Sequence, residues 1–307
     1  MRPITTAELL QQGLTKQDIR ARQRRGDLVR LTRGLWTTRE LRPEDRHVAL
    51  ASARSHALAL ESAALLHGLP VYTLPARVVT VRAGGGRSRR HGEEWAMSGP
   101  LPDHHLTTID GALVTTRART VVDLARVRGL LAGLIPWDAA RWTAREDHAL
   151  MIFDDATDEV IETLAGRRGI GRARQARTLS SALSQSPAET RSLAAIRQLG
   201  LPEPVQQFAV VGPGGRSVGF SDFAWPDEGV LGEYDGLGKY TELSRPGETP
   251  ADVMRREKRR QEAMEALGWV FARWGKEEMA QPHLLRQRIQ GAFAIARNRQ
   301  ARHANAS

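Results

Sequence analysis

The spacing of apolar residues at the start of the chain changes from helical to extended. Thr5 followed by Glu8 is a capping pattern that opens a short helix ending near Gly13, and a second helix is expected over residues 15–25. Gly26 stops this second helix. Two short extended segments follow, residues 28–31 and 34–37, and they are expected to pair. The pattern predicts two helices and then a hairpin.

The middle of the chain mixes both kinds of spacing. Residues 57–68 carry apolar side chains at helical intervals and close with a glycine, which predicts a helix. Strands are expected at residues 76–82 and 113–115. The glycine- and arginine-rich segment 84–90 is expected to be an exposed basic loop. This region predicts an α/β unit in which we identify no catalytic constellation.

The last third of the chain shows the clearest pattern. Ser186, Pro187 and Glu189 are typical of a helix start, and Gly200 ends that helix. Extended segments at 217–225 and 229–236 are separated by a turn and predict a β-hairpin. Residues 251–267 predict a helix, and 269–274 predict a buried strand.

Together these segments predict a fold of the α/β (α+β) class with several domains. The expected divisions are a head at residues 1–46, a connecting α/β domain at 47–165, a linker at 166–185, a C-terminal domain at 186–285 and a basic tail at 286–307.

Charge and composition narrow the class of protein. A formal net charge of +10, made mostly by arginine, suits a nucleic-acid partner, although arginine-rich coding from a GC-rich genome would raise the charge without such a partner. The absence of cysteine excludes disulfides, thiolate catalysis and cysteine-ligated zinc. No apolar run approaches a membrane span and no apolar leader opens the sequence, so a soluble, cytoplasmic protein without membrane contact is expected.

Carboxylates are concentrated on the predicted C-terminal hairpin. Because side chains alternate along a strand, Asp222 shares a face with Phe220, while Glu233 and Asp235 share a face with Leu231. Ionised carboxylates among apolar strand residues need a compensating cation or raised pKa values. A divalent cation held by Asp222, Glu233 and Asp235 would satisfy this need, and such a cation also polarises phosphodiesters for hydrolysis.

The N-terminal order of helix, helix and hairpin resembles the winged helix-turn-helix head of AbiEi-type antitoxins. The resemblance implies that the helix at 15–25 enters the DNA major groove while the hairpin touches the backbone. Segment 116–125 resembles a helix of the connecting domain in the same proteins. The implied DNA-binding residues are Lys16, Arg20, Arg22, Arg24, Arg25, Arg30 and Arg33. The alternative is a solvated helix whose arginines only keep the head soluble.

The region from 185 to 277 resembles the PD-(D/E)XK nucleases, most closely the very-short-patch-repair-like endonucleases. The resemblance implies Asp222 and Glu233 as ligands of Mg²⁺ or Mn²⁺, with Glu189 as an extra carboxylate on the first helix. Asp235 stands where the motif usually has lysine, so Asp235 becomes a further ligand and Lys239 takes the lysine role. On the following helix, Arg256, Lys258 and Arg259 would touch DNA or form an ordinary solvated face.

Each of these acidic residues also has a structural interpretation. Glu189 fits a capping box, Asp222 can pair with an arginine, and Glu233 and Asp235 can be polar residues of a half-exposed strand. The histidines at positions 56, 67, 104 and 105 are expected to be surface or packing residues, since their spacing matches no helical metal-binding pair.

Two functions follow from the sequence. The first is a metal-dependent DNA endonuclease guided by the winged head. The second is a non-catalytic DNA-binding regulator or antitoxin, with a cognate toxin as a further partner, that keeps a degenerate nuclease fold.

Overall fold

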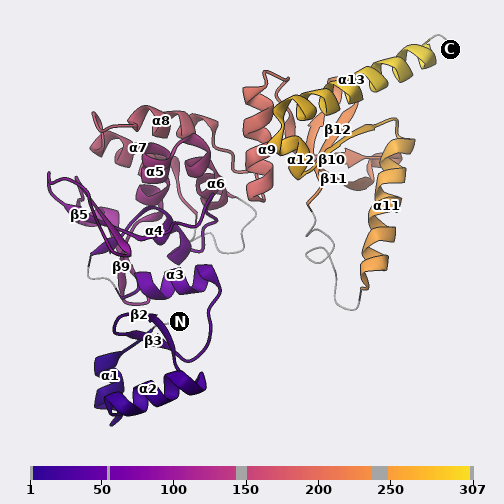
Figure 1. Cartoon of the computed structure of the whole chain (residues 1–307). Helices are drawn as coiled ribbons and strands as arrows, with labels where there is room; N and C mark the ends of the chain where they lie inside the picture. The colour runs from indigo at the N-terminus through magenta and orange to yellow at the C-terminus, as the bar shows by residue number, and fades with distance from the viewer. Residues whose placement is uncertain (1–2, 54–55, 143–150, 237–247, 305–307) are drawn as a thin grey trace. The chain divides into compact units, whose positions relative to one another are not determined.

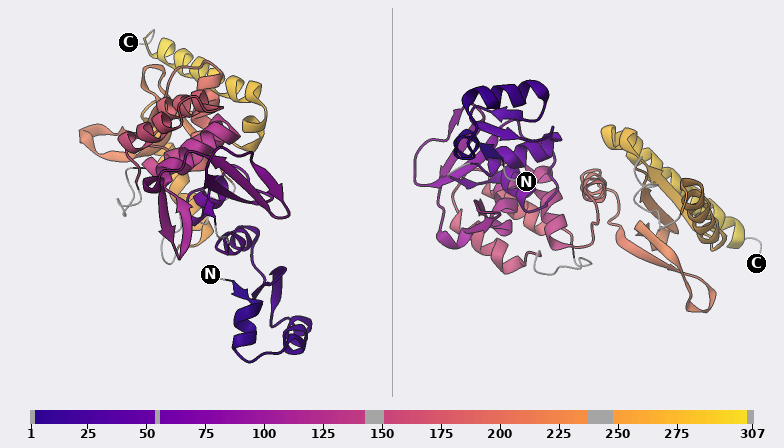
Figure 2. Two further views of the ribbon diagram at one scale, coloured as in Figure 1. Left: turned by 90° about the vertical axis from the view of Figure 1, so that its left-hand side faces the viewer. Right: turned by 90° about the horizontal axis from the view of Figure 1, so that it is seen from below.

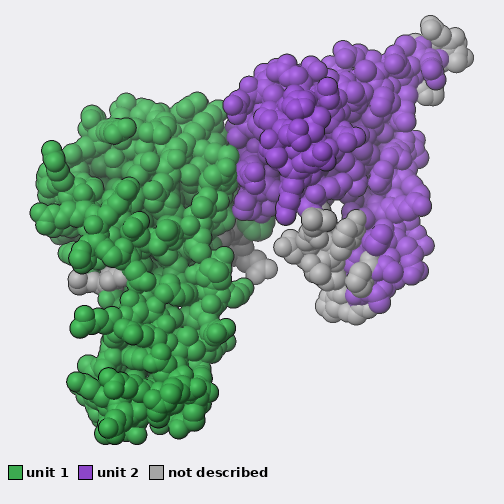
Figure 3. Space-filling model, viewed as in Figure 1, with its two compact units in different colours: residues 1–180 green, residues 181–307 purple. Residues whose placement is uncertain are grey.

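The computed structural model describes residues 3–53, 56–142, 151–236 and 248–304, and Figure 1 shows the arrangement of its helices and strands. The chain is a mixed α/β protein, as the sequence predicted. It forms two compact units, residues 1–180 and 181–307 (Figure 3). Within the described ranges, no helix combines the length and the apolar character needed to cross a bilayer.

The N-terminal segment of the first unit is built as the sequence predicted, with one extra strand. Its elements are β1 (Ile4–Thr5), α1 (Thr6–Gln11), α2 (Lys16–Arg25), β2 (Val29–Thr32) and β3 (Leu35–Thr37). The strands form an antiparallel sheet in the order β1-β3-β2. Leu9, Ile19, Leu28 and Trp36 form a small core under both helices. Only β1 was missed, because two residues carry no periodic signal.

A six-stranded mixed sheet forms the centre of the first unit, in the order β6-β7-β5-β4-β9-β8. The pairs β5–β7 and β4–β9 are parallel and the remaining neighbours are antiparallel. The strands are β4 (Ala57–Leu58), β5 (Val78–Ala83), β6 (Arg89–His91), β7 (Glu94–Gly99), β8 (Leu106–Ile109) and β9 (Ala112–Thr115). The predicted strands at 76–82 and 113–115 are therefore confirmed.

Helices surround this sheet and complete the unit. They are α3 (Pro43–Ala51), α4 (Leu60–Leu66), α5 (Arg117–Arg128), α6 (Leu130–Arg141), α7 (Asp154–Thr163) and α8 (Ile170–Leu179). Helices α5 and α6 pack so closely that a Cβ at Gly133 would lie 2.4 Å from the Cα of Ala125. Residues 166–185 were expected to be a linker, but most of them belong to the first unit. Ala173 and Ala176 of α8 are fully buried, and the boundary between the units follows Ser180.

The second unit is organised by a four-stranded sheet in the order β10-β11-β12-β13. Neighbouring strands are antiparallel except β12 and β13, which are parallel and joined through α11. The elements are α9 (Pro187–Gln198), β10 (Val205–Val211), β11 (Ser217–Trp225), β12 (Val230–Tyr234), α11 (Pro250–Ala266), β13 (Val270–Trp274), α12 (Lys276–Ala280) and α13 (Pro282–Ala304). The predicted hairpin is β11–β12, whereas β10, whose hairpin with β11 projects in Figure 2, was not predicted.

The two faces of this sheet are covered by different helices. Phe223, Trp225 and Trp274 pack with residues of α9 and α13, whereas Ala224 and Leu231 pack with Met264 of α11. Figure 1 shows α9 and α11 on different sides of the sheet. The expected basic tail at 286–307 is corrected by α13, since its apolar residues, such as Ile289 and Phe293, belong to the core.

Candidate functional site

Helix α2 carries a dense group of exposed cations. A capping box fixes its start: Thr15 Oγ1 accepts a hydrogen bond from the Asp18 backbone at 3.2 Å, and Asp18 accepts the Thr15 amide at 2.8 Å. These hydrogen bonds from Thr15, first from its hydroxyl and then from its amide, lower the pKa of Asp18. Ile19 anchors the helix in the small core. The capped and anchored helix therefore has a fixed outer face.

The predicted DNA-binding residues of this segment all lie on its surface. Arg20 and Arg24 are one turn apart and exposed, whereas Ile19 is buried. Arg25 pairs with the exposed Asp27 at 3.0 Å, and the Arg30 Nε donates to the Thr32 carbonyl at 3.4 Å. Lys16, Arg22 and Arg33 are exposed as well. The structure thus brings Arg20 and Arg24 together as one basic face.

The turn between α1 and α2 suits a helix-turn-helix arrangement. Four residues, 12–15, join the helices, and Gly13 has a φ of +85° that side-chain-bearing residues rarely adopt. Turns of this length with glycine are typical of helix-turn-helix motifs. Trp36 of β3 donates its indole N–H to Thr6 of α1 at 2.9 Å, which ties the hairpin to the first helix.

The acidic residues of the predicted hairpin lie on the α11 face of the second sheet. Phe223 of β11 pairs with Gly232 of β12, so Asp222 and Glu233 are the next positions along the two strands. They point to the opposite face from Phe223, toward α11. The sequence therefore placed these two residues correctly as neighbours.

Glu233 is held by two arginines. It is 3% exposed, and its two oxygens contact Arg260 of α11 at 2.7 Å and Arg273 of β13 at 2.8 Å. Burial would lower the pKa of Arg260, but the carboxylates of Glu233 and Glu257 outweigh burial and raise it. The negative charge expected to attract a metal is therefore compensated by guanidinium groups.

The remaining hairpin carboxylates also have contacts within the sheet. Asp222 accepts the backbone N–H of Tyr234 at 3.1 Å, which links the ends of the two strands. Asp235 is half-exposed, and its Oδ2 lies 3.6 Å from Arg273. Lys239, expected to act as the motif lysine, lies outside the described residues.

Glu189 is a helix-capping residue. It accepts hydrogen bonds from the Gln185 amide and the Ser186 hydroxyl, both at 2.9 Å, while Ser186 accepts the Glu189 amide at 3.2 Å. A further bond comes from the Gln207 side chain at 3.0 Å. Helix α9 packs on the sheet face opposite to Asp222 and Glu233. The Ser186–Glu189 hydrogen bonds agree with the capping interpretation, whereas the bonds from Gln185 and Gln207 are not part of a capping box.

The expected metal ligands that the structure describes do not form a cluster of three carboxylates. Among the described residues, Glu189, Asp222, Glu233 and Asp235 form no group of three carboxylates whose oxygens lie within 4.8 Å of one another. A cation beside Glu233 would also have to displace two guanidiniums. Arg260 and Arg273 were not expected as partners of Glu233, because the pairing of β12 with β13 and the position of α11 are not visible in the sequence.

Two of the basic residues expected on α11 are exposed and the third is partly buried. Lys258 and Arg259 are exposed, and Lys258 lies 3.9 Å from Glu262 on the same helix. Arg256 is partly buried and contacts Glu248 at 3.3 Å. Arg260, which was not among the expected residues, reaches the sheet, where it donates to the Phe220 carbonyl and to Glu233.

A separate cluster in the first unit brings together His104, His105 and Glu159, whose possible ligand atoms lie within 4.8 Å of one another. Arg119 Nη1 lies 3.0 Å from His105 Nδ1, and because guanidinium only donates, Nδ1 must accept. The proton is then on Nε2, which donates to Glu159 at 2.7 Å. No lone pair of His105 is left for a metal, so this cluster is a hydrogen-bond network.

The network changes the acidity of Glu159. Burial of this carboxyl raises its pKa, but hydrogen bonds from His105, His104 and Thr163 outweigh burial and lower the pKa to about 2. His105 itself is 1% exposed. This agrees with the packing role that the sequence suggested for His105.

Comparison with known proteins finds two relatives, and neither of their names states an activity. No known protein-family model matches the chain. The chain is 28% identical over 263 residues to two uncharacterized proteins of Mycobacterium tuberculosis, MT2308 and Rv2248, which come from two strains. The match covers 84% of this chain and 89% of each relative, so both units have counterparts there.

Proposed function

We propose that this protein is a DNA-binding regulator that uses α2 to contact duplex DNA. The observation that carries the proposal is the outward basic face of α2, with Arg20 and Arg24 one turn apart on a helix anchored by Ile19. Guanidinium groups at such positions bind phosphates and guanine edges. The preceding glycine turn and the following hairpin support a winged helix-turn-helix arrangement.

In this proposal, the second unit is a non-catalytic scaffold with a nuclease-like order of elements. The support is the state of Glu233, whose two oxygens are occupied by Arg260 and Arg273. A carboxylate paired in this way stabilises the sheet–helix contact instead of holding a catalytic ion.

The proposal is tested by DNA affinity. Replacing Arg20 and Arg24 together by glutamine should weaken binding of the full chain to duplex DNA by at least about tenfold, as expected for the loss of two charge-assisted contacts. The matched control is Arg299→Gln with Arg302→Gln, two exposed arginines of α13, which changes the net charge equally. Equal weakening by both double variants would refute a specific role of α2.

A DNA endonuclease is the second candidate. The order α9-β10-β11-β12-α11-β13 and the adjacency of Asp222 and Glu233 favour it, because PD-(D/E)XK nucleases are built in this order. Incubation of plasmid with the protein and Mg²⁺ or Mn²⁺ tests it. Nicking that disappears in Asp222→Ala and Glu233→Ala would replace the regulator proposal with this one.

A further inference from the structure

A cavity of about 550 Å³ lies in the first unit, between the six-stranded sheet and helices α4, α5 and α6. Its polar and aromatic lining comes from Glu61, Tyr72, Arg77, Arg90, Trp95 and Arg128. The volume falls within the range of about 300–1,000 Å³ that is usual for small-molecule sites. No site was expected in this region from the sequence.

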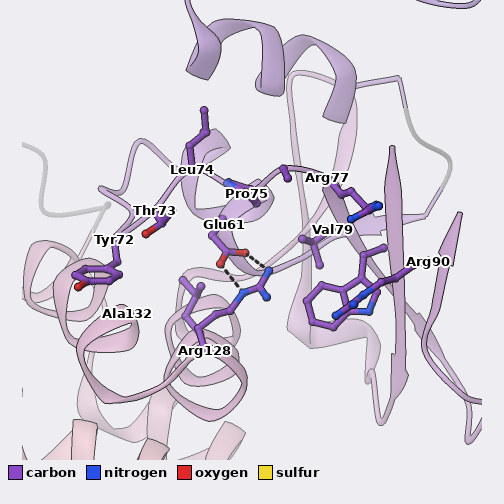
Figure 4. Close-up of a pocket in the computed structure, with 13 residues that line it drawn as sticks. Glu61, Tyr72, Thr73, Leu74, Pro75, Arg77, Val79, Arg90, Arg128 and Ala132 are labelled. Carbon is purple, nitrogen blue, oxygen red and sulfur yellow. Dashed lines mark hydrogen bonds and ion pairs between the residues drawn. The ribbon is translucent and has the colours of Figure 1, made fainter. Parts of the chain in front are cut away.

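Three guanidiniums meet in this cavity, opposed by one carboxylate. Arg128 donates to both oxygens of Glu61, at 2.6 and 3.1 Å, as Figure 4 shows. Arg77 donates its Nε to the Gly92 carbonyl at 2.9 Å. In the described part of the chain, neither Arg77 nor Arg90 has an ion-pair partner. The cavity therefore carries two positive charges in excess.

Two of these guanidiniums are fixed on an aromatic ring. The guanidinium carbons of Arg128 and Arg90 lie 4.7 and 5.3 Å from the centre of the Trp95 ring. Cation–π contact holds the planar groups in place before a ligand arrives, so less side-chain freedom is lost on binding. Their remaining N–H groups suit the oxygens of a phosphate.

The other part of the cavity is apolar and aromatic. Tyr72, which is 51% exposed, is accompanied by Leu74 and Pro75. Figure 4 places Arg77 and Arg90 on one side and Tyr72 on the other, with Arg128 and Glu61 between them. A ligand that fits has a phosphate at one end and a flat, weakly polar group at the other.

We propose that this cavity binds a 5′-nucleotide, either free or as the phosphorylated end of a single strand. The phosphate contacts Arg77, Arg90 and Arg128, and the base lies against Tyr72 and Leu74. The proposal rests on the cavity alone and does not depend on DNA binding by α2.

The test is calorimetric titration of the full chain with 5′-AMP, with adenosine and inorganic phosphate as partial ligands and a 5′-phosphorylated oligothymidylate as the strand-end probe. The critical variant is Arg90→Gln. Its matched control is Arg89→Gln, the preceding residue on β6, which is exposed and pairs with Ala96 where Arg90 pairs with Trp95. Side chains of neighbouring strand residues point to opposite faces, so Arg89 does not line the cavity.

We expect 5′-AMP or the oligonucleotide to bind more tightly than either partial ligand, and Arg90→Gln to weaken that binding by about tenfold while Arg89→Gln leaves it unchanged. Binding of 5′-AMP identifies a free nucleotide as ligand, and binding of the oligonucleotide alone identifies a strand end. Failure of both probes to bind, or equal weakening by the two variants, overturns the proposal. Since any contact of α2 with the oligonucleotide is the same in both variants, the result is independent of the head.

Discussion

At the scale of single residues, Glu233 is the most informative position of the second unit. A carboxylate that is 3% exposed is costly unless it is paired, and Arg260 and Arg273 supply that pairing from a helix and a neighbouring strand. Removing one partner of a buried pair leaves the other charges uncompensated. Glu233 is therefore expected to contribute to stability.

Glu233→Gln should lower the free energy of unfolding by about 1–3 kcal/mol, because the amide leaves the two partly buried guanidiniums without their carboxylate. Chemical denaturation of the purified chain measures this. Glu228→Gln is the control, since its contact with Arg297 is long, 4.0 Å, and should change stability by less than about 0.5 kcal/mol. An increase in stability for Glu233→Gln would instead indicate a carboxylate kept for ligand binding at a cost to folding.

His47 makes the first unit sensitive to acid. Ser62 accepts the Val79 amide at 2.8 Å, and its hydroxyl forms a second hydrogen bond with His47 Nε2, 2.9 Å away. Burial, aided by the nearby charge of Arg46, lowers the pKa of His47 from 6.5 to about 4. The unfolded chain therefore takes up a proton at a pH where the folded chain does not.

Because the pKa of His47 is lower in the folded chain than in the unfolded chain, protonation favours unfolding. The free energy of unfolding is therefore highest above pH 6.5 and decreases as the pH falls to about 4. The expected slope is up to about 1.4 kcal/mol per pH unit in this window. Denaturation curves at several pH values check it. His47→Gln should flatten the profile, and a profile as steep as that of the original chain would contradict the assignment.

At the scale of elements, the packing of α5 on α6 depends on the absence of a side chain at Gly133. A methyl group there would meet the backbone of Ala125 at 2.4 Å, a distance that packed atoms do not tolerate. Helix α5 also carries the buried Arg119–Asp123 pair, at 2.7 Å. The helix pair is therefore closely packed, with little room for a larger side chain at position 133.

Gly133→Ala should destabilise the chain by about 1–3 kcal/mol, although alanine favours helix formation, because the helices must move apart. Gly171→Ala is the control: it lies in α8, nothing is within 4 Å of its Cβ position, and it should be neutral or stabilise by up to about 1 kcal/mol. Thermal unfolding compares the two. Similar effects of both substitutions would show that the contact is not critical.

Some helices and strands could be predicted from the sequence, and others could not. Long helices with caps, such as α2 and α9, and the β11–β12 hairpin follow from local periodicity and were predicted. Strand β10 was missed, because Gln206 and Gln207 interrupt its alternation and its place is set by pairing with β11. Helix α13 was predicted to be a basic tail, because the many arginines in its sequence made its buried apolar residues difficult to recognise.

In the candidate site, too, only contacts between residues close together in the sequence could be predicted. The sequence identified Asp222 and Glu233 as strand neighbours because both lie on one hairpin. It did not identify the contacts of Arg260 and Arg273 with Glu233, since partners that are 27 and 40 positions away along the chain are determined by packing and not by local spacing. The same applies to Glu159, which meets His105 across 54 positions.

At the scale of the whole molecule, a net charge of +10 attracts polyanions without specifying where they bind. The salt dependence of binding separates this general attraction from specific phosphate contacts. Each phosphate that is neutralised contributes about 0.9 to the slope of log affinity against log salt concentration.

If Arg20 and Arg24 each contact one phosphate, replacing both should reduce the steepness of this slope by about 1.8. Fluorescence anisotropy with duplex DNA at several salt concentrations measures it. The α13 pair, Arg299 and Arg302, serves again for comparison. An unchanged slope in the α2 variant would locate the phosphate contacts elsewhere on the chain.

Because two guanidiniums share the carboxylate of Glu233, the substitutions that evolution can accept at these three positions are restricted. Replacing Glu233 leaves Arg260 and Arg273 without their shared carboxylate, and replacing either arginine leaves the buried Glu233 with one partner fewer. Positions 233, 260 and 273 should therefore be replaced in concert among homologues. A single substitution at any of these three positions should be poorly tolerated, because it leaves at least one charge of the cluster without its partner.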